Sequence, residues 1–405
     1  MPKIRTQTIL WIVVAIPILI FALVVGSWTF AILTTRPIHQ GAQAVATVAA
    51  PASAAGWAAA IDEARPIVRA DVASLNLPGL SVAVAVGGDI VWAEGFGWAD
   101  VENRVKFEPD TRFYVGTASK MLTSAAVGLL MEKGQLSLDE PIQTYVPGFP
   151  EKPWPVTLRQ IMAHTAGIRR DAGDEEPVRV HCGDTLEALP RFADKDLLFE
   201  PGTAYRYSNY GWILVSGAVE AGSGEPFPTF MRRHIFEPLG MTDTRAEALD
   251  GNPDQAVYYF PRFAGDTRYG TQGPETVDFS CFAGAGAILS TPSDMVRFIN
   301  AVANVALLKP ETVQILQASQ RLAGGDETGY GLGWDLETVT LRGEPTRVIG
   351  YDGELRDGRV SSFIIFPERE LVIAVMSNMS FADTTSIAMK IAEIFAARVP
   401  TGRRE

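Results

Sequence analysis

The longest hydrophobic run lies at the N-terminus of the chain. Residues 9–33 are almost wholly apolar, and no charged residue occurs between Arg5 and Arg36. A helix over this run would rise about 37 Å, which is enough to cross a bilayer with some tilt. The apolar region of a signal peptide is usually only about 7–15 residues long, so we favour an uncleaved membrane anchor. The competing interpretation is a long signal peptide that is cut after the run, where residues 44–46 (Ala-Val-Ala) suit a peptidase.

The charges that flank this run predict its orientation. Lys3 and Arg5 precede it, and only Arg36 follows it closely. The positive-inside rule therefore places the N-terminus in the cytoplasm and the rest of the chain outside it. In a bacterial cell this predicts a single-pass protein of the inner membrane whose folded part lies in the periplasm.

The pattern then changes twice, which divides the chain into three parts. Residues 37–56 are small, rich in Ala and Pro, and lack an amphipathic period, as is typical of a tether. A helical pattern resumes at Trp57 and runs to Ser74. We therefore expect an anchor over residues 1–36, a tether after it, and a folded domain over residues 57–400.

Two pairs of apolar segments predict β-hairpins near the two ends of this domain. Residues 80–86 and 90–96 flank a Gly-Gly-Asp turn, and residues 361–366 and 371–376 flank a Pro-Glu-Arg-Glu turn. An amphipathic helix over residues 382–399 closes the chain. Residues 97–360, which have a different pattern, lie between the first hairpin and the last one.

That central pattern consists of helical segments broken by Pro and Gly. Strands at both ends and helices between them predict an α/β (α+β) fold. Its antiparallel sheet is assembled from residues of about 57–117 and 286–400, and an all-helical domain is inserted over residues of about 118–285. The sequence does not indicate an oligomeric state.

The net charge and the small number of residues that could bind a metal exclude several functions. The net charge of −12 and the pI near 5.0 argue against nucleic acid as a partner, because such a partner needs a basic face. The four histidines are scattered and no Cys-x-x-Cys motif occurs, so neither a metal nor a cofactor is implied. The two cysteines, Cys182 and Cys281, form a disulfide if the domain lies in an oxidising compartment; otherwise they are separate buried thiols.

The first candidate catalytic residues lie where an extended segment leads into a helix. Gly116 permits a sharp turn, and Thr117 suits the first turn of the helix that follows. Thr117 and Lys120 are three positions apart and therefore share one helix face. A hydroxyl and an ammonium held together at a helix N-terminus form a nucleophile–base pair. For these residues alone, however, an ordinary capped helix with a solvated lysine is the commoner explanation.

A second polar cluster, residues 205–209 (Tyr-Arg-Tyr-Ser-Asn), follows a Glu-Pro-Gly-Thr turn. In an extended or looped segment, Tyr207 and Asn209 point to the same side. A phenol whose pKa is lowered by a neighbouring ammonium can act as a general base, and an amide can hold a substrate carbonyl. Taken alone, the cluster also fits a turn with a buried tyrosine and an asparagine cap.

Together the two clusters resemble the motifs of the serine β-lactamase-like family, which includes class C β-lactamases, penicillin-binding DD-peptidases and related esterases. The resemblance covers about residues 57–398, and further segments follow in the family's order. Those segments are residues 138–147, 156–167, 237–244, 283–294 and 330–334.

The resemblance implies a role for each matching residue. Thr117 takes the place of the nucleophilic serine, Lys120 that of the adjacent base, and Tyr207 and Asn209 match the family's Y-x-N pair. We expect the Thr117 hydroxyl within reach of Lys120 Nζ, with Tyr207 close by. A Lys120 ammonium there would favour the tyrosinate form of Tyr207. His164 is expected to be structural.

The family's third motif falls at residues 351–353 (Tyr-Asp-Gly), so Tyr351 and Gly353 are expected to bind substrate. Tyr351 should face the cleft and hydrogen-bond with Tyr207 or Lys120. The family's oxyanion hole then consists of the backbone N–H groups of Thr117 and Glu354.

Two departures from the family pattern leave two hypotheses open. Thr117 keeps a hydroxyl, but its methyl group restricts χ1 and crowds the attack path. Tyr351 replaces a cation that helps to bind a substrate carboxylate. The first hypothesis is a membrane-anchored acyl-transfer hydrolase that acts on an amide or ester carbonyl of a small molecule or peptide. The alternative is a pseudoenzyme that binds cell-wall peptide or serves as a scaffold.

Overall fold

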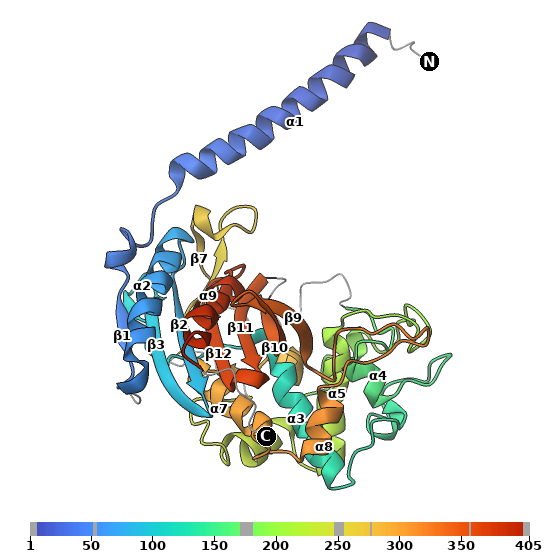
Figure 1. The fold of residues 1–405 in the computed structure, drawn as a ribbon. Helices are drawn as coiled ribbons and strands as arrows, with labels where there is room; N and C mark the ends of the chain where they lie inside the picture. The colour runs from blue at the N-terminus through green and yellow to red at the C-terminus, as the bar shows by residue number, and fades with distance from the viewer. Residues whose placement is uncertain are drawn as a thin grey trace.

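An antiparallel sheet of eight strands forms the centre of the molecule (Figure 1). The structure, a computed structural model, describes residues 6–51, 55–170, 181–246, 255–275, 278–355 and 358–399. The strand order is β1-β3-β2-β12-β11-β10-β9, with β4 paired to β3. The neighbours β2 and β12 come from opposite ends of the domain, which confirms the prediction of one sheet built from both ends. The strands are β1 (Thr47–Ala49), β2 (Gly79–Val86), β3 (Asp89–Asp100), β4 (Val105–Lys106), β9 (Asp335–Leu341), β10 (Glu344–Leu355), β11 (Gly358–Phe366) and β12 (Leu371–Ser377).

Successive side chains of the central strands point to opposite faces of the sheet and so contribute to two separate hydrophobic cores. In β2, Val84 packs on the face that α2 (Ala58–Ser74) and α9 (Thr384–Ala396) cover, whereas Ala83 joins the core on the opposite face. Because helices cover both faces, β2 and β12 are buried along nearly their whole length and read as continuous apolar runs.

A largely helical region packs against the opposite face and supplies most of the larger core (Figure 1). Two short strands, β5 (Phe113–Tyr114) and β8 (Leu289–Ser290), pair with each other where this region joins the sheet. Its helices are α3 (Ser119–Glu132), α4 (Leu158–Met162), α5 (Asn209–Ser223), α6 (Phe227–Met231), α7 (Pro292–Ala303) and α8 (Pro310–Leu316).

Two short stretches differ from the sequence prediction. The insertion over 118–285 is not all helical, because β6 (Tyr258–Pro261) and β7 (Thr271–Glu275) form a hairpin there. The run of aromatic residues in β6 favours a strand, and Tyr258 and Phe260 belong to a separate small core. The composition of residues 37–56 predicts a tether, whereas Thr47–Ala49 pair with β3 as an edge strand. The pairing of an edge strand depends on backbone groups, so small side chains do not prevent it.

The N-terminal helix α1 (Thr6–Thr34) projects from the folded domain as one long element (Figure 1). From Ile16 to Thr34 its side chains are exposed, with Leu33 at 79%, except for Ala31 at 3%. This segment is the one helix among the described residues that is long and apolar enough to cross a membrane. A signal sequence would have the same properties, so length and composition alone do not decide between the two.

Candidate active site

The candidate nucleophile lies at a tight junction between strand β5 and helix α3. Gly116 has a φ of +63°, and a Cβ there would lie 2.7 Å from the carbonyl oxygen of Glu354. Only glycine tolerates both the left-handed backbone and this close approach. Thr117 follows in a short 3₁₀ turn (Gly116–Ala118) that leads into α3, and it is 7% exposed.

Strand β10 brings the predicted oxyanion donor to this threonine. The backbone N–H of Glu354 donates to Thr117 Oγ1 at 2.9 Å, and Thr117 Oγ1 lies 3.4 Å from the carbonyl oxygen of Asp352. The register of β10 shifts between Gly353 and Glu354, and a Cβ on Gly353 would lie 2.1 Å from the carbonyl oxygen of Val115. Gly353 therefore allows β10 to reach the nucleophile turn.

Lys120 is fully buried and its Nζ is surrounded by oxygen atoms. Tyr207 Oη and Asn209 Oδ1 each lie 2.8 Å from it, and the carbonyl oxygens of Ala285 and Thr117 lie at 3.1 Å and 3.5 Å. Lys120 thus reaches the backbone of Thr117, not the hydroxyl that the sequence predicts as its partner. The Tyr207 hydroxyl accepts from Lys120 Nζ and donates to Asn209 Oδ1 at 2.9 Å, and the nearby Thr117 side chain lowers the pKa of its phenol. Tyr207 therefore lies beside both Thr117 and the amine of Lys120.

Burial sets the protonation of this pair and overturns the expected tyrosinate. Burial lowers the pKa of Lys120 well below its ordinary value of 10.5; the charges of Asp335 and Glu354 act in the opposite direction, and Arg170 lowers it further. Burial also raises the pKa of the Tyr207 phenol, against the effect of the Thr117 and Tyr351 side chains. The prediction that a Lys120 ammonium favours ionised Tyr207 is thus wrong in direction, because the cost of burying either charge is the larger effect. Both groups are favoured as neutral: an amine beside a phenol.

Tyr351 lies in the same cluster of hydroxyl groups. Its Oη accepts from Tyr330 Oη at 3.4 Å, and its side chain lowers the pKa of the Tyr207 phenol. Lys120 Nζ is 5.8 Å from the centre of the Tyr351 ring. Tyr351 therefore lies near Tyr207 and Lys120, and a hydrogen bond to either of them stays a prediction. Tyr330 is an additional member that belongs to one of the segments carrying the family resemblance.

His164 supports the loop that carries Tyr207 and Asn209. Its Nδ1 accepts the backbone N–H of Ser208 at 3.1 Å, and its ring lies 4.5 Å from that of Tyr207. Burial lowers the pKa of His164 well below 6.5, so the imidazole is neutral and its proton lies on Nε2. The Ser208 hydroxyl caps α5 by accepting the N–H of Gly211, which fixes Asn209 in the first turn of that helix.

Two charged residues near the site were not singled out from the sequence. The guanidinium of Arg170 lies 5.8 Å from the centre of the Tyr207 ring. Asp335, at the start of β9, accepts the backbone N–H of Asp352, and burial together with the Asp352 charge raises its pKa to about 7. Neither residue lies in a recognisable motif; the fold alone brings them to the cluster. The part of the chain that the structure describes has no group of His, Cys, Asp and Glu that could hold a metal ion.

The disulfide predicted as one alternative is present. Cys182 and Cys281 are bonded, with their Cα atoms 4.9 Å apart, which is within the usual range for a disulfide. The Ser280 hydroxyl also accepts the backbone N–H of Cys182 at 2.8 Å. The bond therefore fixes the segment Ser280–Ala285, whose last carbonyl contacts Lys120.

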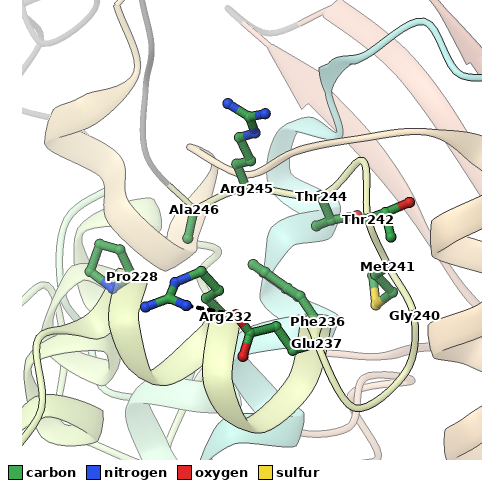
Figure 2. Close-up of a pocket in the computed structure, with 10 residues that line it drawn as sticks. All are labelled: Pro228, Arg232, Phe236, Glu237, Gly240, Met241, Thr242, Thr244, Arg245 and Ala246. Carbon is green, nitrogen blue, oxygen red and sulfur yellow. Dashed lines mark hydrogen bonds and ion pairs between the residues drawn. The ribbon is translucent and has the colours of Figure 1, made fainter.

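A cavity of about 480 Å³ lies elsewhere, between α6 with the helical turn that follows it and the segment of residues 240–246 (Figure 2). Phe236 and Met241 form part of its lining, and Arg232 at its edge is paired with Glu237 at 2.6 Å. Among the described residues that line it, none belongs to the Thr117 cluster. We assign this cavity no part in the chemistry.

The fold and the arrangement of side chains around Thr117 are those of a β-lactamase-type serine hydrolase. The chain belongs to the β-lactamase family, whose profile matches residues 64–396. Among curated relatives, the mouse "Serine beta-lactamase-like protein LACTB, mitochondrial" is 26% identical over 85% of this chain and 81% of its own length. "Penicillin-binding protein 4*" of Bacillus subtilis (strain 168) is 27% identical over 67% of this chain and 62% of its own length.

Solved structures of the same fold are similar at the level of architecture. The octameric penicillin-binding protein homologue from Pyrococcus abyssi has a TM-score of 0.70 and 23% identity, and it covers 83% of this chain and 77% of its own. EstCE1, described as a hydrolase with promiscuous acyltransferase activity, has a TM-score of 0.69 and 19% identity over 83% and 98% of the two chains. A D-stereospecific amidohydrolase from Streptomyces has a TM-score of 0.66 and 20% identity over 82% and 98%. Family members of this fold are hydrolases, which supports a hydrolase here.

Proposed function

We propose that the protein is a membrane-anchored hydrolase that cleaves an amide or ester bond through an acyl-enzyme on Thr117. The observation that supports this most directly is the cluster at Thr117, where Glu354 N–H donates to Thr117 Oγ1 at 2.9 Å and Tyr207 Oη lies 2.8 Å from Lys120 Nζ. The relatives include penicillin-binding proteins, a hydrolase with acyltransferase activity and an amidohydrolase, which agrees with an amide or ester substrate. Asn209, Tyr351 and Gly353 complete the proposed substrate site.

Acylation begins with proton transfer away from the nucleophile. As Thr117 Oγ1 attacks the substrate carbonyl carbon, its proton passes to Tyr207 Oη, and the Tyr207 proton passes to the neutral Lys120 amine. Lys120 can take the proton because burial favours its neutral amine, which has a free electron pair to accept it. The carbonyl oxygen becomes an oxyanion that the backbone N–H groups of Thr117 and Glu354 stabilise.

Release of the first product reverses the same chain. The leaving nitrogen or oxygen takes a proton from Tyr207, which is replenished from Lys120, and the Thr117 ester remains. A water molecule then attacks the ester carbonyl and loses its proton along the same path. The bond between the acyl carbon and Thr117 Oγ1 breaks, and Oγ1 takes a proton back from Tyr207, which releases the acid and restores the hydroxyl. Asn209, fixed at the N-terminus of α5, is placed to hold a polar group of the substrate beside Lys120.

The anchor completes the proposal. The exposed apolar side chains of α1 from Ile16 to Thr34 would face lipid, and the flanking charges orient the folded domain to the non-cytoplasmic side. In a bacterial cell this is the periplasmic face of the inner membrane. A disulfide between Cys182 and Cys281 agrees with an oxidising compartment of that kind.

Acylation of Thr117 is tested by intact mass after incubation with a fluorophosphonate and with a fluorescent penicillin. The wild type is expected to gain one adduct. Thr117→Ser should acylate about ten-fold faster or more, because it removes the methyl that restricts χ1 and crowds the attack path, and Thr117→Ala should not acylate. Thr229→Ser, on α6 outside the site, is the matched control and should behave as wild type. Full labelling of Thr117→Ala would show that the nucleophile is assigned wrongly.

The pseudoenzyme remains the second candidate because of two observations. The Thr117 side chain is buried, and Tyr351 occupies the position of the third motif at which a cation, Lys or His, is expected from the family pattern. If neither the wild type nor Thr117→Ser ever forms an adduct, the site binds without reacting. A cell-wall peptide that protects Thr117→Ser against thermal unfolding would then support the binding function.

A further inference from the structure

The loop of the β6–β7 hairpin packs against the anchor helix. The ring of Trp28, near the end of α1, lies 5.3 Å from that of Phe263 and 5.6 Å from that of Tyr269, both edge to face. Phe263 and Tyr269 lie 5.7 Å from each other, so the three rings form one aromatic cluster. Aromatic pairs in such geometry contribute about 0.5–1.5 kcal/mol beyond the area that they bury.

The same loop also binds the backbone at the end of the helix. Arg262 donates to the carbonyl oxygens of Ala31 at 3.0 Å and Thr34 at 3.4 Å. These belong to the last turn of α1, where carbonyl groups lack partners within the helix and carry partial negative charge. Ala31 is buried by this packing, unlike the other described side chains from Ile16 to Thr34. The loop is therefore attached to the helix end by polar and apolar contacts.

The position of Trp28 in the apolar run fixes the depth of the loop. If a hydrocarbon core of about 30 Å is centred on residues 9–33, it holds about twenty helical residues and ends near residue 31. Trp28 then lies about 5 Å inside that boundary. A side chain in contact with the Trp28 ring lies at the boundary between acyl chains and headgroups, not in bulk water.

We propose that the loop of residues 262–270 is a second membrane contact that rests in the lipid headgroup region on the outer face of the bilayer. The inference rests on the proposed anchoring by α1. Tyrosine and tryptophan favour that depth, and the loop has a net positive charge, with Arg262 and Arg268 against one aspartate, which lipid phosphates attract. The one acidic residue of the loop, Asp266, is paired with Arg268 at 2.7 Å, so the loop presents no unbalanced negative charge to the phosphates.

The hairpin also connects this contact to the candidate active site. Tyr258 of β6 packs on Tyr114, which lies three residues before Thr117, and their ring centres are 6.3 Å apart. Leu355, next to the oxyanion donor Glu354, belongs to the same small core. The two membrane contacts therefore hold the domain in one orientation, with the nucleophile at a fixed height above the lipid.

The test measures depth in the full chain, reconstituted in vesicles of phosphatidylethanolamine and phosphatidylglycerol. Because both native cysteines are bonded to each other, an added cysteine can be labelled selectively with a nitroxide. Ala264→Cys, exposed in the loop, should collide with oxygen several-fold more than with a water-soluble nickel chelate, relative to Ile315→Cys. Ile315 is an exposed residue of α8, on the side of the domain away from α1 (Figure 1).

Two further labelled variants distinguish failure of the proposed anchor from failure of the loop contact. Leu23→Cys, in the middle of the anchor, should give the highest oxygen preference, and an aqueous signal there would overturn the anchor and the loop contact together. A lipid signal at Leu23 with an aqueous signal at Ala264 would overturn the loop contact alone. If Ala264→Cys does not fold, Arg268→Cys, whose side chain is 67% exposed, replaces it with the same expectation.

Discussion

Lys120 is the residue whose burial determines the protonation of the whole cluster. Its amine is enclosed by Tyr207, Asn209 and two backbone carbonyl oxygens, and no carboxylate lies among these contacts. A charged lysine in such a place is costly, so the folded state favours the neutral amine. That cost has a measurable signature in the pH dependence of stability.

Stability should rise with pH more steeply in the wild type than in Lys120→Met. The folded pKa of Lys120 lies well below its usual 10.5, so the unfolded chain binds more protons between the two values, and unfolding becomes harder as pH rises. Between the folded pKa of Lys120 and about pH 9.5, the wild type should gain up to about 1.4 kcal/mol per pH unit relative to the variant. Urea unfolding at several pH values measures this. Lys133→Met, an exposed lysine at the end of α3, should parallel the wild type; parallel curves for Lys120→Met would refute the shift.

At this scale the sequence predicted which residues meet but not how they titrate. Thr117, Tyr207 and Glu354 come together because each matches a family motif whose spacing the fold preserves. The direction of the Tyr207 pKa was missed, because it depends on how completely neighbouring elements cover the hydroxyl. Arg170 and Asp335 were missed for a related reason, since no local pattern marks a residue that a distant loop or strand end brings to the site.

Strand β10 is the element whose approach completes the site. Gly353→Ala places a methyl group 2.1 Å from both the Val115 carbonyl oxygen and the Ser361 hydroxyl, and β10 must move away. We expect a loss of about 3 kcal/mol in unfolding free energy and loss of acylation, since the Glu354 N–H moves with the strand. Gly324→Ala, whose nearest neighbour is 4.0 Å away, should change stability by less than about 0.5 kcal/mol. A Gly353→Ala protein that acylates normally would show that this strand need not approach so closely.

The segment Ser280–Ala285 depends on the disulfide in a similar way. The bond joins residues 99 positions apart, and chain entropy predicts a loss of about 4–5 kcal/mol when Cys182 and Cys281 are both replaced by Ala. Acylation should fall as well, because the Ala285 carbonyl that contacts Lys120 loses its support. Denaturant unfolding and labelling rates measure the two effects. A reductant should destabilise the wild type and leave the double variant unchanged; equal stability of the two proteins would contradict the argument.

The boundaries of helices and strands could be predicted where apolar residues recur at the spacing of one buried face. Both hairpins of the main sheet and the closing helix were predicted within a few residues, because buried faces require alternation or helical spacing. Strand β1 and the β6–β7 hairpin were missed. β1 has small side chains without alternation, and its pairing depends on an open edge of β3 that the local sequence cannot reveal.

At the scale of the whole molecule, the charges around α1 predict on which side of the membrane the domain lies. Alkaline phosphatase fused after Gly56 should be active in a bacterial host, because the enzyme folds only outside the cytoplasm. A fusion of β-galactosidase at the same position is the reciprocal control and should be inactive. The opposite pair of results would mean that the N-terminus, not the folded domain, faces the outside.

The pairing of β2 with β12 has a kinetic consequence. The central pair of the sheet joins residues near 80 to residues near 375, so the sheet cannot close until the last strand has been synthesised. Contacts between such distant segments form slowly, because the intervening chain must first lose much of its conformational entropy. Until then β2 and β3 expose apolar faces and an open edge, a state prone to aggregation. Successful folding of this protein therefore depends on protecting its first hairpin while the rest of the chain emerges.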